Sequence, residues 1–111
     1  MLTSNLLKDD PDLIDLLDKF MTRLPVMRDA ALQAHNDKKA EEFSGLIHQL
    51  KGVGGGYGYP MLTELCVQIE LQIASQHTEN VNTLMQEFSL MVEEILKGSE
   101  ENHKIVEQAQ P

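Results

Sequence analysis

One histidine of this 111-residue chain has neighbours that suit phosphoryl chemistry. When the segment around His48 is wound as an α-helix of about 3.6 residues per turn, its apolar residues fall on the opposite side. Lys51 lies about one turn from His48 on the polar side, where Ser44, Gly52 and Gly55 also lie. The sequence therefore presents an imidazole to solvent, places an ammonium group beside it and keeps the surroundings small.

A histidine in this setting can carry a phosphoryl group. An imidazole with an ordinary pKa of about 6.5 is mostly neutral at pH 7, so one ring nitrogen can attack while the other keeps its proton. The Lys51 ammonium can offset negative charge on the transferring group. Because an interior glycine costs a helix roughly 0.5–1 kcal/mol relative to alanine, glycines on the face of His48 indicate that another surface comes close there. In isolation, His48 or Lys51 would be interpreted as an ordinary solvated side chain, and it is their shared neighbourhood that favours phosphoryl chemistry.

A longer motif extends this pattern along the chain: His48-x-x-Lys51-Gly52-x-x-Gly55-x-x-Gly58, followed by Leu62, Leu65, Cys66 and Glu70. It resembles the histidine-containing phosphotransfer (HPt) domain of bacterial phosphorelays, and the resemblance covers roughly residues 10–97. The chain departs from the usual pattern at Val53, where the family commonly has Ala or Ser, and at the extra glycines Gly54 and Gly56.

The resemblance implies roles for several residues. His48 would be phosphorylated, Lys51 would stabilise the phosphoryl group, and the small residues on the same face would form the docking surface for a receiver domain: Ser44, Gly52 and Gly55. Some members have a Gln at the position of Glu70 that hydrogen-bonds the histidine, so Glu70 is a candidate for orienting the imidazole; the alternative is an ordinary surface acid. The receiver would supply its aspartate, Mg²⁺ and much of the catalysis, so the chain is expected to need no cofactor or metal of its own and to be a carrier rather than an enzyme.

The sequence thus favours a phosphorelay intermediate that accepts a phosphoryl group on His48 from a receiver aspartate and passes it to a response regulator. The expected partners are the receiver domains of a hybrid histidine kinase and of a response regulator, and the chain itself is expected to be a monomer. The alternative is a non-catalytic helical adaptor that binds a partner protein. Acid-labile, base-stable phosphorylation of His48 separates the two. A phosphohistidine phosphatase is disfavoured because no further general base stands out.

The charge balance and the single cysteine exclude several other classes. Eighteen acids against nine bases give a net charge of −9, which argues against binding to nucleic acid or anionic lipid. One cysteine cannot form an internal disulfide, and Cys66 lies on the apolar side of its helix, where it reads as a core residue.

Further sequence signals are absent or ordinary. His35, His77 and His103 lack metal-ligand spacing and read as surface residues. With no signal-peptide pattern and no apolar run near the ~18 residues of a membrane span, a cytoplasmic protein is expected.

Apolar spacing predicts four long helices. The first begins at Asp10-Pro11 and runs to about His35, with Pro25 producing a kink rather than a break. The second helix is predicted to be capped by Asn36-Asp37, to carry His48 and to end within Val53–Gly58. The third is predicted to start at Tyr59-Pro60 and to end around Ser75–His77. The fourth is predicted to be capped within Thr78–Asn80 and to stop at Gly98.

These elements predict an all-α, antiparallel up-and-down four-helix bundle over residues 1–98, with a short extra helix within residues 1–9. Its core is expected to hold Phe20, Phe43 and Phe88 as the large side chains. Residues 99–111 are predicted to be a loose polar tail, unless Ile105 and Val106 extend the last helix.

Overall fold

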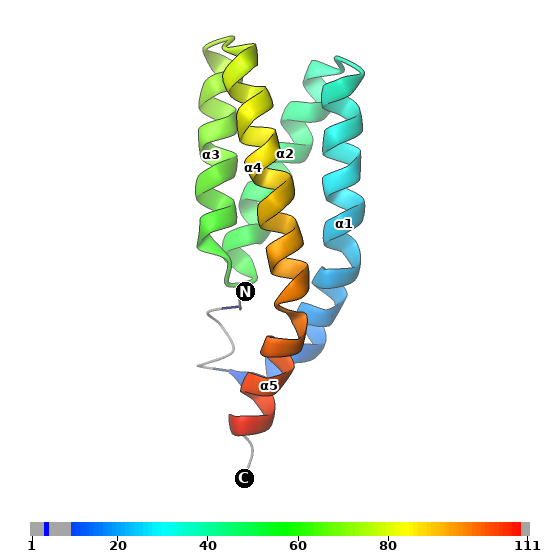
Figure 1. Cartoon of the computed structure of the whole chain (residues 1–111), viewed down its shortest axis with the longest axis vertical. Helices are drawn as coiled ribbons and strands as arrows, with labels where there is room; N and C mark the ends of the chain where they lie inside the picture. The colour runs from blue at the N-terminus through cyan, green and yellow to red at the C-terminus, as the bar shows by residue number, and fades with distance from the viewer. Residues whose placement is uncertain (1–3, 5–9, 110–111) are drawn as a thin grey trace.

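The computed structural model describes residue 4 and residues 10–109, which form an elongated helical bundle (Figure 1). A short 3-10 helix, η2 (Pro11–Leu13), leads into five α-helices: α1 (Ile14–Asn36), α2 (Ala40–Gly56), α3 (Pro60–Ala74), α4 (Thr78–Lys97) and α5 (Ser99–Ala109). Helices α1–α4 confirm the predicted all-α four-helix bundle, and no described residue is in a strand. The short helix predicted within residues 1–9 lies outside the described residues, apart from Ser4.

The core contains the three phenylalanines that the sequence indicated. Phe20, Phe43 and Phe88 are all buried, and the aliphatic stripes of the four helices surround them. Sequence reasoning missed the aromatic contribution of the α2–α3 connection: Tyr59 is 1% exposed, and the Tyr57 ring stacks on that of Phe20 with centroids 4.5 Å apart. This aromatic group closes the bundle at the end where α2 finishes.

The predicted helix start at Asp10-Pro11 opens with the 3-10 helix η2, and α1 itself begins at Ile14. The carboxylate of Asp10 accepts a hydrogen bond from the backbone N–H of Asp12 (3.2 Å), which satisfies one of the free donors at the helix start. The helix then runs through Pro25 without a break. The apolar stripe stays in phase across the proline, so packing against the core outweighs the loss of one backbone hydrogen bond.

The connections between helices correct two predicted caps. Neither Lys39 before α2 nor His77 before α4 makes a side-chain capping hydrogen bond, and Asp37 instead accepts one from Gln33 Nε2 (2.9 Å) in the preceding helix. The predictions that Asn36-Asp37 and Thr78–Asn80 cap the following helices are therefore wrong.

Each of helices α1, α2 and α3 ends instead in a turn closed by a left-handed residue. Lys38, Gly58 and Gln76 have φ values of 58°, 85° and 60°. The residue after each donates its backbone N–H to a carbonyl five positions back, at 2.8–3.0 Å. This is the Schellman ending of a helix, and it satisfies carbonyls that would otherwise lack donors.

The C-terminal segment is helical, so the loose-tail interpretation is wrong for residues 99–109 and the alternative of a helical extension is the better description. Helix α4 ends at Lys97, and Gly98 follows it, as predicted. In α5, Asn102 is 1% exposed: its Nδ2 donates to the Tyr59 hydroxyl and its Oδ1 accepts from the Ser4 backbone N–H, both at 3.0 Å. Val106 adds apolar burial, so α5 is attached to the bundle through both polar and apolar contacts.

Candidate phosphotransfer site

Helix α2 holds His48 in a fixed position facing solvent. Ile47 and Leu50, on either side of it in the sequence, are both fully buried and fix the rotation of the helix about its axis. The His48 side chain is 72% exposed. The structure therefore confirms that the imidazole lies on the polar face and leaves it open to another molecule.

A carboxylate from α3 joins His48 and Lys51. Glu70 Oε1 lies 3.6 Å from His48 Nδ1 and 3.2 Å from Lys51 Nζ, and the ammonium donates a hydrogen bond to Glu70 Oε2 at 3.2 Å. The side chains of Lys51 and Glu70 are about one-third exposed, at 30% and 29%. An imidazole, an ammonium and a carboxylate thus meet at the α2–α3 seam.

One oxygen of this carboxylate has no hydrogen bond among the described residues. Glu70 Oε1 is buried and lacks a donor with suitable geometry, although His48 Nδ1 and Lys51 Nζ are both near. An unsatisfied buried oxygen is costly, so a small rotation that brings a donor onto it is favourable. The His48 ring can supply such a donor from its Nδ1, and so can the Lys51 ammonium, which lies nearer to the same oxygen.

Close packing between α2 and α3 positions Glu70. These two helices share the most extensive contact in the bundle. The Thr63 hydroxyl of α3 donates a hydrogen bond to the backbone carbonyl of Lys51 in α2 at 2.7 Å. Gly54 of α2 is buried against Thr63. A Cβ on Gly54 would meet Thr63 Oγ1 at 3.0 Å and Leu62 Cβ at 3.1 Å, so the absence of a side chain permits this approach.

The glycines of α2 therefore divide into two groups. A Cβ on Gly45, Gly52 or Gly56 would meet no heavy atom within 4 Å, whereas one on Gly55 would lie 3.3 Å from Thr63 Oγ1. Gly52 fits the predicted open face fully. Gly55 is exposed but also borders the seam, and Gly54 was missed as a packing position. In the sequence, only the length of the glycine run indicated that some of these glycines serve packing against α3 as well as the open face.

The last predicted docking residue also lies near His48 along α2. Ser44 is one turn before the histidine and is half-buried. Together with Gly52 and Gly55 it lines the helix on both sides of the imidazole. These residues form a low surface, and their role in contacting a partner stays a prediction.

Cys66 lies behind the site, in the core. It is fully buried, and burial raises the pKa of its thiol to about 12, with the Glu70 charge adding to the rise and Lys51 opposing it. The thiol is thus held protonated at neutral pH, which confirms the prediction of a core residue and disfavours redox chemistry.

The remaining histidines have ordinary neighbours. His35 pairs with Asn82 (2.6 Å), His77 with Gln72 (3.1 Å) and His103 with Asp18 (2.9 Å). Within residue 4 and residues 10–109, no group of three or more potential metal ligands comes together.

A family model for the Hpt domain matches residues 13–98, a range that includes all of helices α1–α4. The chain belongs to the Hpt domain family. Hpt domains are phosphotransfer intermediates of two-component signalling; they carry the phosphoryl group and interact with receiver domains. Searches of curated proteins and of solved structures return no match to this Hpt domain. None of its described helices is both long enough and apolar enough to cross a membrane.

Proposed function

We propose that His48 is the phosphorylated residue of this Hpt domain, that it accepts the phosphoryl group from a receiver aspartate and that it passes the group to a response regulator. The observation that carries the proposal is the joint position of His48, Lys51 and Glu70: an exposed imidazole has an ammonium and a carboxylate on its inner side. Among the described histidines, the other three lack such a pair of neighbours.

The geometry supports Nε2 as the attacking atom. Glu70 lies on the Nδ1 side of the ring, so a proton held on Nδ1 leaves the Nε2 lone pair directed toward the partner. As the Nε2–P bond forms, the P–O bond to the receiver aspartate breaks and the aspartate leaves as a carboxylate. The ring becomes positively charged while it keeps the Nδ1 proton, and the Glu70 carboxylate stabilises that charge.

Lys51 supplies positive charge on the same face. In the unphosphorylated protein its ammonium is paired with Glu70, and its flexible side chain needs only a short movement to reach a phosphoryl group on the neighbouring ring. Phosphoryl transfer depends mainly on positioning and charge neutralisation. The receiver is expected to bring the Mg²⁺, so Lys51 complements charge that the partner already provides.

The docking surface is proposed to lie over Ser44, Gly52 and Gly55. Bare backbone at Gly52 allows a receiver to approach α2 closely. On α3, Val67 is 40% exposed one turn before Glu70, which adds an apolar contact beside the site. A low, partly apolar surface around an exposed nucleophile suits a partner that must bring its aspartate within bonding distance.

The test is transfer of radiolabelled phosphoryl groups from phosphorylated receivers to the wild-type protein and to His48→Gln. Wild type is expected to take up acid-labile, base-stable label, and the variant to take up none while melting at the same temperature. His103→Gln is the matched control, since His103 is also an exposed histidine but pairs with Asp18. Label that persists on His48→Gln would contradict the assignment. An unlabelled wild type that still binds the receiver would favour the adaptor.

A further inference from the structure

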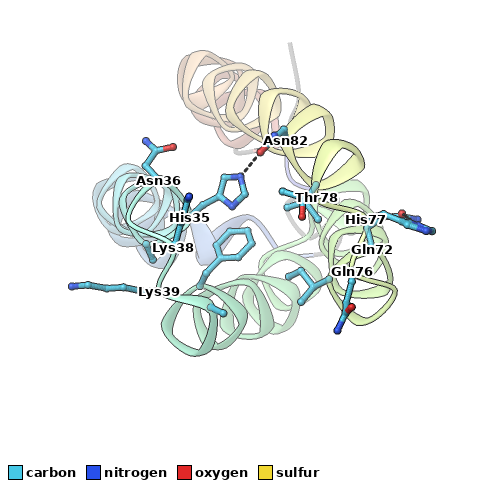
Figure 2. Close-up of a pocket in the computed structure, with 14 residues that line it drawn as sticks. His35, Asn36, Lys38, Lys39, Gln72, Gln76, His77, Thr78 and Asn82 are labelled. Atoms are coloured by element: carbon cyan, nitrogen blue, oxygen red, sulfur yellow. Dashed lines mark hydrogen bonds between the residues drawn. The ribbon is translucent and has the colours of Figure 1, made fainter.

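A hollow of about 670 Å³ opens at the end of the bundle where α1 joins α2 and α3 joins α4 (Figure 2). Its inner wall is apolar and is formed by Ala34, Phe43, Ile73 and Val81. His48 and its partners do not line it. A volume of this size falls within the roughly 300–1,000 Å³ typical of small-molecule sites, and an apolar wall with a few polar groups is their usual lining.

Polar side chains stand at the mouth of the hollow. His35 crosses from α1 toward α4, where its Nε2 lies 2.6 Å from Asn82 Oδ1, and its ring packs on Phe43 with centroids 4.8 Å apart. Thr78, the first residue of α4, points into the opening (Figure 2). Its hydroxyl makes no hydrogen bond with any described residue. The mouth therefore offers a free hydroxyl beside the apolar wall.

The lining also differs in charge from the rest of the chain. The protein has 18 acids and nine bases, yet the lining contains Lys38 and Lys39 and no described acidic residue. In Figure 2, Lys39 extends away from the hollow, whereas Lys38 lies on the same side of the opening as His35. The acids in the first turns of the neighbouring helices, Glu41, Glu42 and Glu79, are exposed and do not line the hollow.

We propose that this hollow binds a small amphiphilic anion: a medium-length alkyl carboxylate with its chain against Phe43, Ile73 and Val81 and its head at the mouth, between Thr78 on one side and Lys38 on the other. The apolar wall suits the chain, and the lining residues include a hydroxyl donor and an ammonium and no carboxylate; Asp37, next to Lys38, accepts a hydrogen bond from Gln33 instead. The uncapped starts of α2 and α4 lie at the same end, and their free N–H groups add to the attraction of an anionic head.

Octanoate, used below its micelle concentration, is the direct probe. In ¹⁵N–¹H NMR spectra of the full chain, octanoate should cause saturable shifts at Ala34, Phe43, Ile73 and Val81 and little change at His48. Affinity should rise about fourfold per added methylene from hexanoate to octanoate, because each buried CH₂ contributes a nearly constant free energy. The neutral 1-octanol should bind several-fold more weakly.

Two pairs of variants test the two halves of the site. Ala40→Phe places a ring at the exposed edge of the hollow and should reduce octanoate binding at least tenfold, while Ala74→Phe, at another exposed position outside the lining, should not. Lys38→Asn should weaken octanoate several-fold without affecting 1-octanol. Asparagine tolerates the left-handed φ of 58° at this position. Lys19→Asn, an exposed lysine of α1 outside the lining, is the charge control.

Three results would overturn the proposal: shifts scattered over exposed apolar residues such as Leu71 and Leu90, no saturation, or equal binding of octanoate by Ala40→Phe and Ala74→Phe. Equal affinity for octanoate and 1-octanol would overturn the anionic head. Phosphotransfer to His48 does not enter any of these measurements, so the site can fail while the proposed function stands.

Discussion

Gly52 and Gly54 stand two residues apart in α2 and face different surroundings. A Cβ on Gly52 would meet nothing within 4 Å, whereas one on Gly54 would meet Thr63 Oγ1 and backbone N at 3.0 and 3.1 Å. The first glycine keeps the face of His48 low, and the second lets α3 approach closely enough for Glu70 to reach the imidazole. One glycine-rich stretch therefore serves two separate requirements, a surface for a partner and a tight seam behind it.

The largest expected effect comes from filling the open face. Gly52→Leu should lower the rate of transfer from a phosphorylated receiver by roughly 10–100-fold, because a leucine at a close contact costs about 1–3 kcal/mol. Thermal stability should hold or rise, since glycine is a poor helix former. Receiver titration by calorimetry, run with Gly52→Ala as the smaller change, measures the effect. A stable Gly52→Leu protein that binds and transfers normally would show that the open face is not the docking surface.

Filling the seam should instead weaken the fold. Gly54→Ala should reduce the free energy of unfolding by about 1–2 kcal/mol, because the contact with Thr63 outweighs the better helix propensity of alanine. Gly52→Ala is the matched control and should raise stability by about 0.5–1 kcal/mol. Urea denaturation followed by circular dichroism compares the two. Equal changes in both variants would remove the distinction between face and seam.

Removing the ammonium should affect transfer more than folding. Lys51→Ala should slow phosphoryl transfer about tenfold, which is less than the roughly 100–1,000-fold lost with a fully enclosed charge-stabilising donor, because the Lys51 side chain is partly solvated. Its ion pair with Glu70 is partly exposed, so loss of stability should stay within about 1 kcal/mol. Rapid-quench transfer at saturating receiver measures the rate, and Lys51→Arg should recover most of it. An unchanged rate would leave Lys51 as a solvated lysine.

The smallest change is expected at Glu70, which acts through His48. Glu70→Ala should slow transfer roughly threefold at saturating receiver, the effect of losing the one modest hydrogen bond that His48 Nδ1 can donate to Glu70 after a small rotation of the ring. Glu70→Gln keeps an acceptor oxygen and should restore most of the rate. If Glu70→Gln is as slow as Glu70→Ala, the carboxylate acts through its charge; if neither is slow, Glu70 has no positioning role.

The periodic parts of the chain were predictable because burial imposes its spacing on them. The apolar stripes located α1–α4, Pro60 marked the start of α3 and Gly98 the end of α4. The turns were less predictable, since Lys38 and Gln76 adopt left-handed conformations that favour glycine or asparagine. Both residues are exposed, and the backbone hydrogen bonds from Lys39 to Ala34 and from His77 to Gln72 close these turns despite the residues' own preference.

The candidate site was predictable from spacing along α2, whereas across the seam the family resemblance pointed to Glu70 without giving its geometry. Spacing alone put His48 and Lys51 on one face of a single helix. The contact with Glu70 depends on how α3 is rotated and how closely it approaches, which Gly54 and Thr63 determine. The burial of Asn102 was not predictable for a similar reason, because its hydrogen-bond partners, Ser4 and Tyr59, are distant in the sequence. The attachment of α5 depends partly on these polar contacts, which an apolar pattern does not reveal.

The most direct test of the account is to locate the phosphoryl group itself. The protein can be labelled with ¹⁵N at its histidine rings, phosphorylated through a receiver and observed by ³¹P and ¹⁵N NMR. We expect one phosphorus–nitrogen coupling, at Nε2 of His48, with the other three histidines unchanged. Coupling at another histidine, or at Nδ1 of His48, would contradict the central claim.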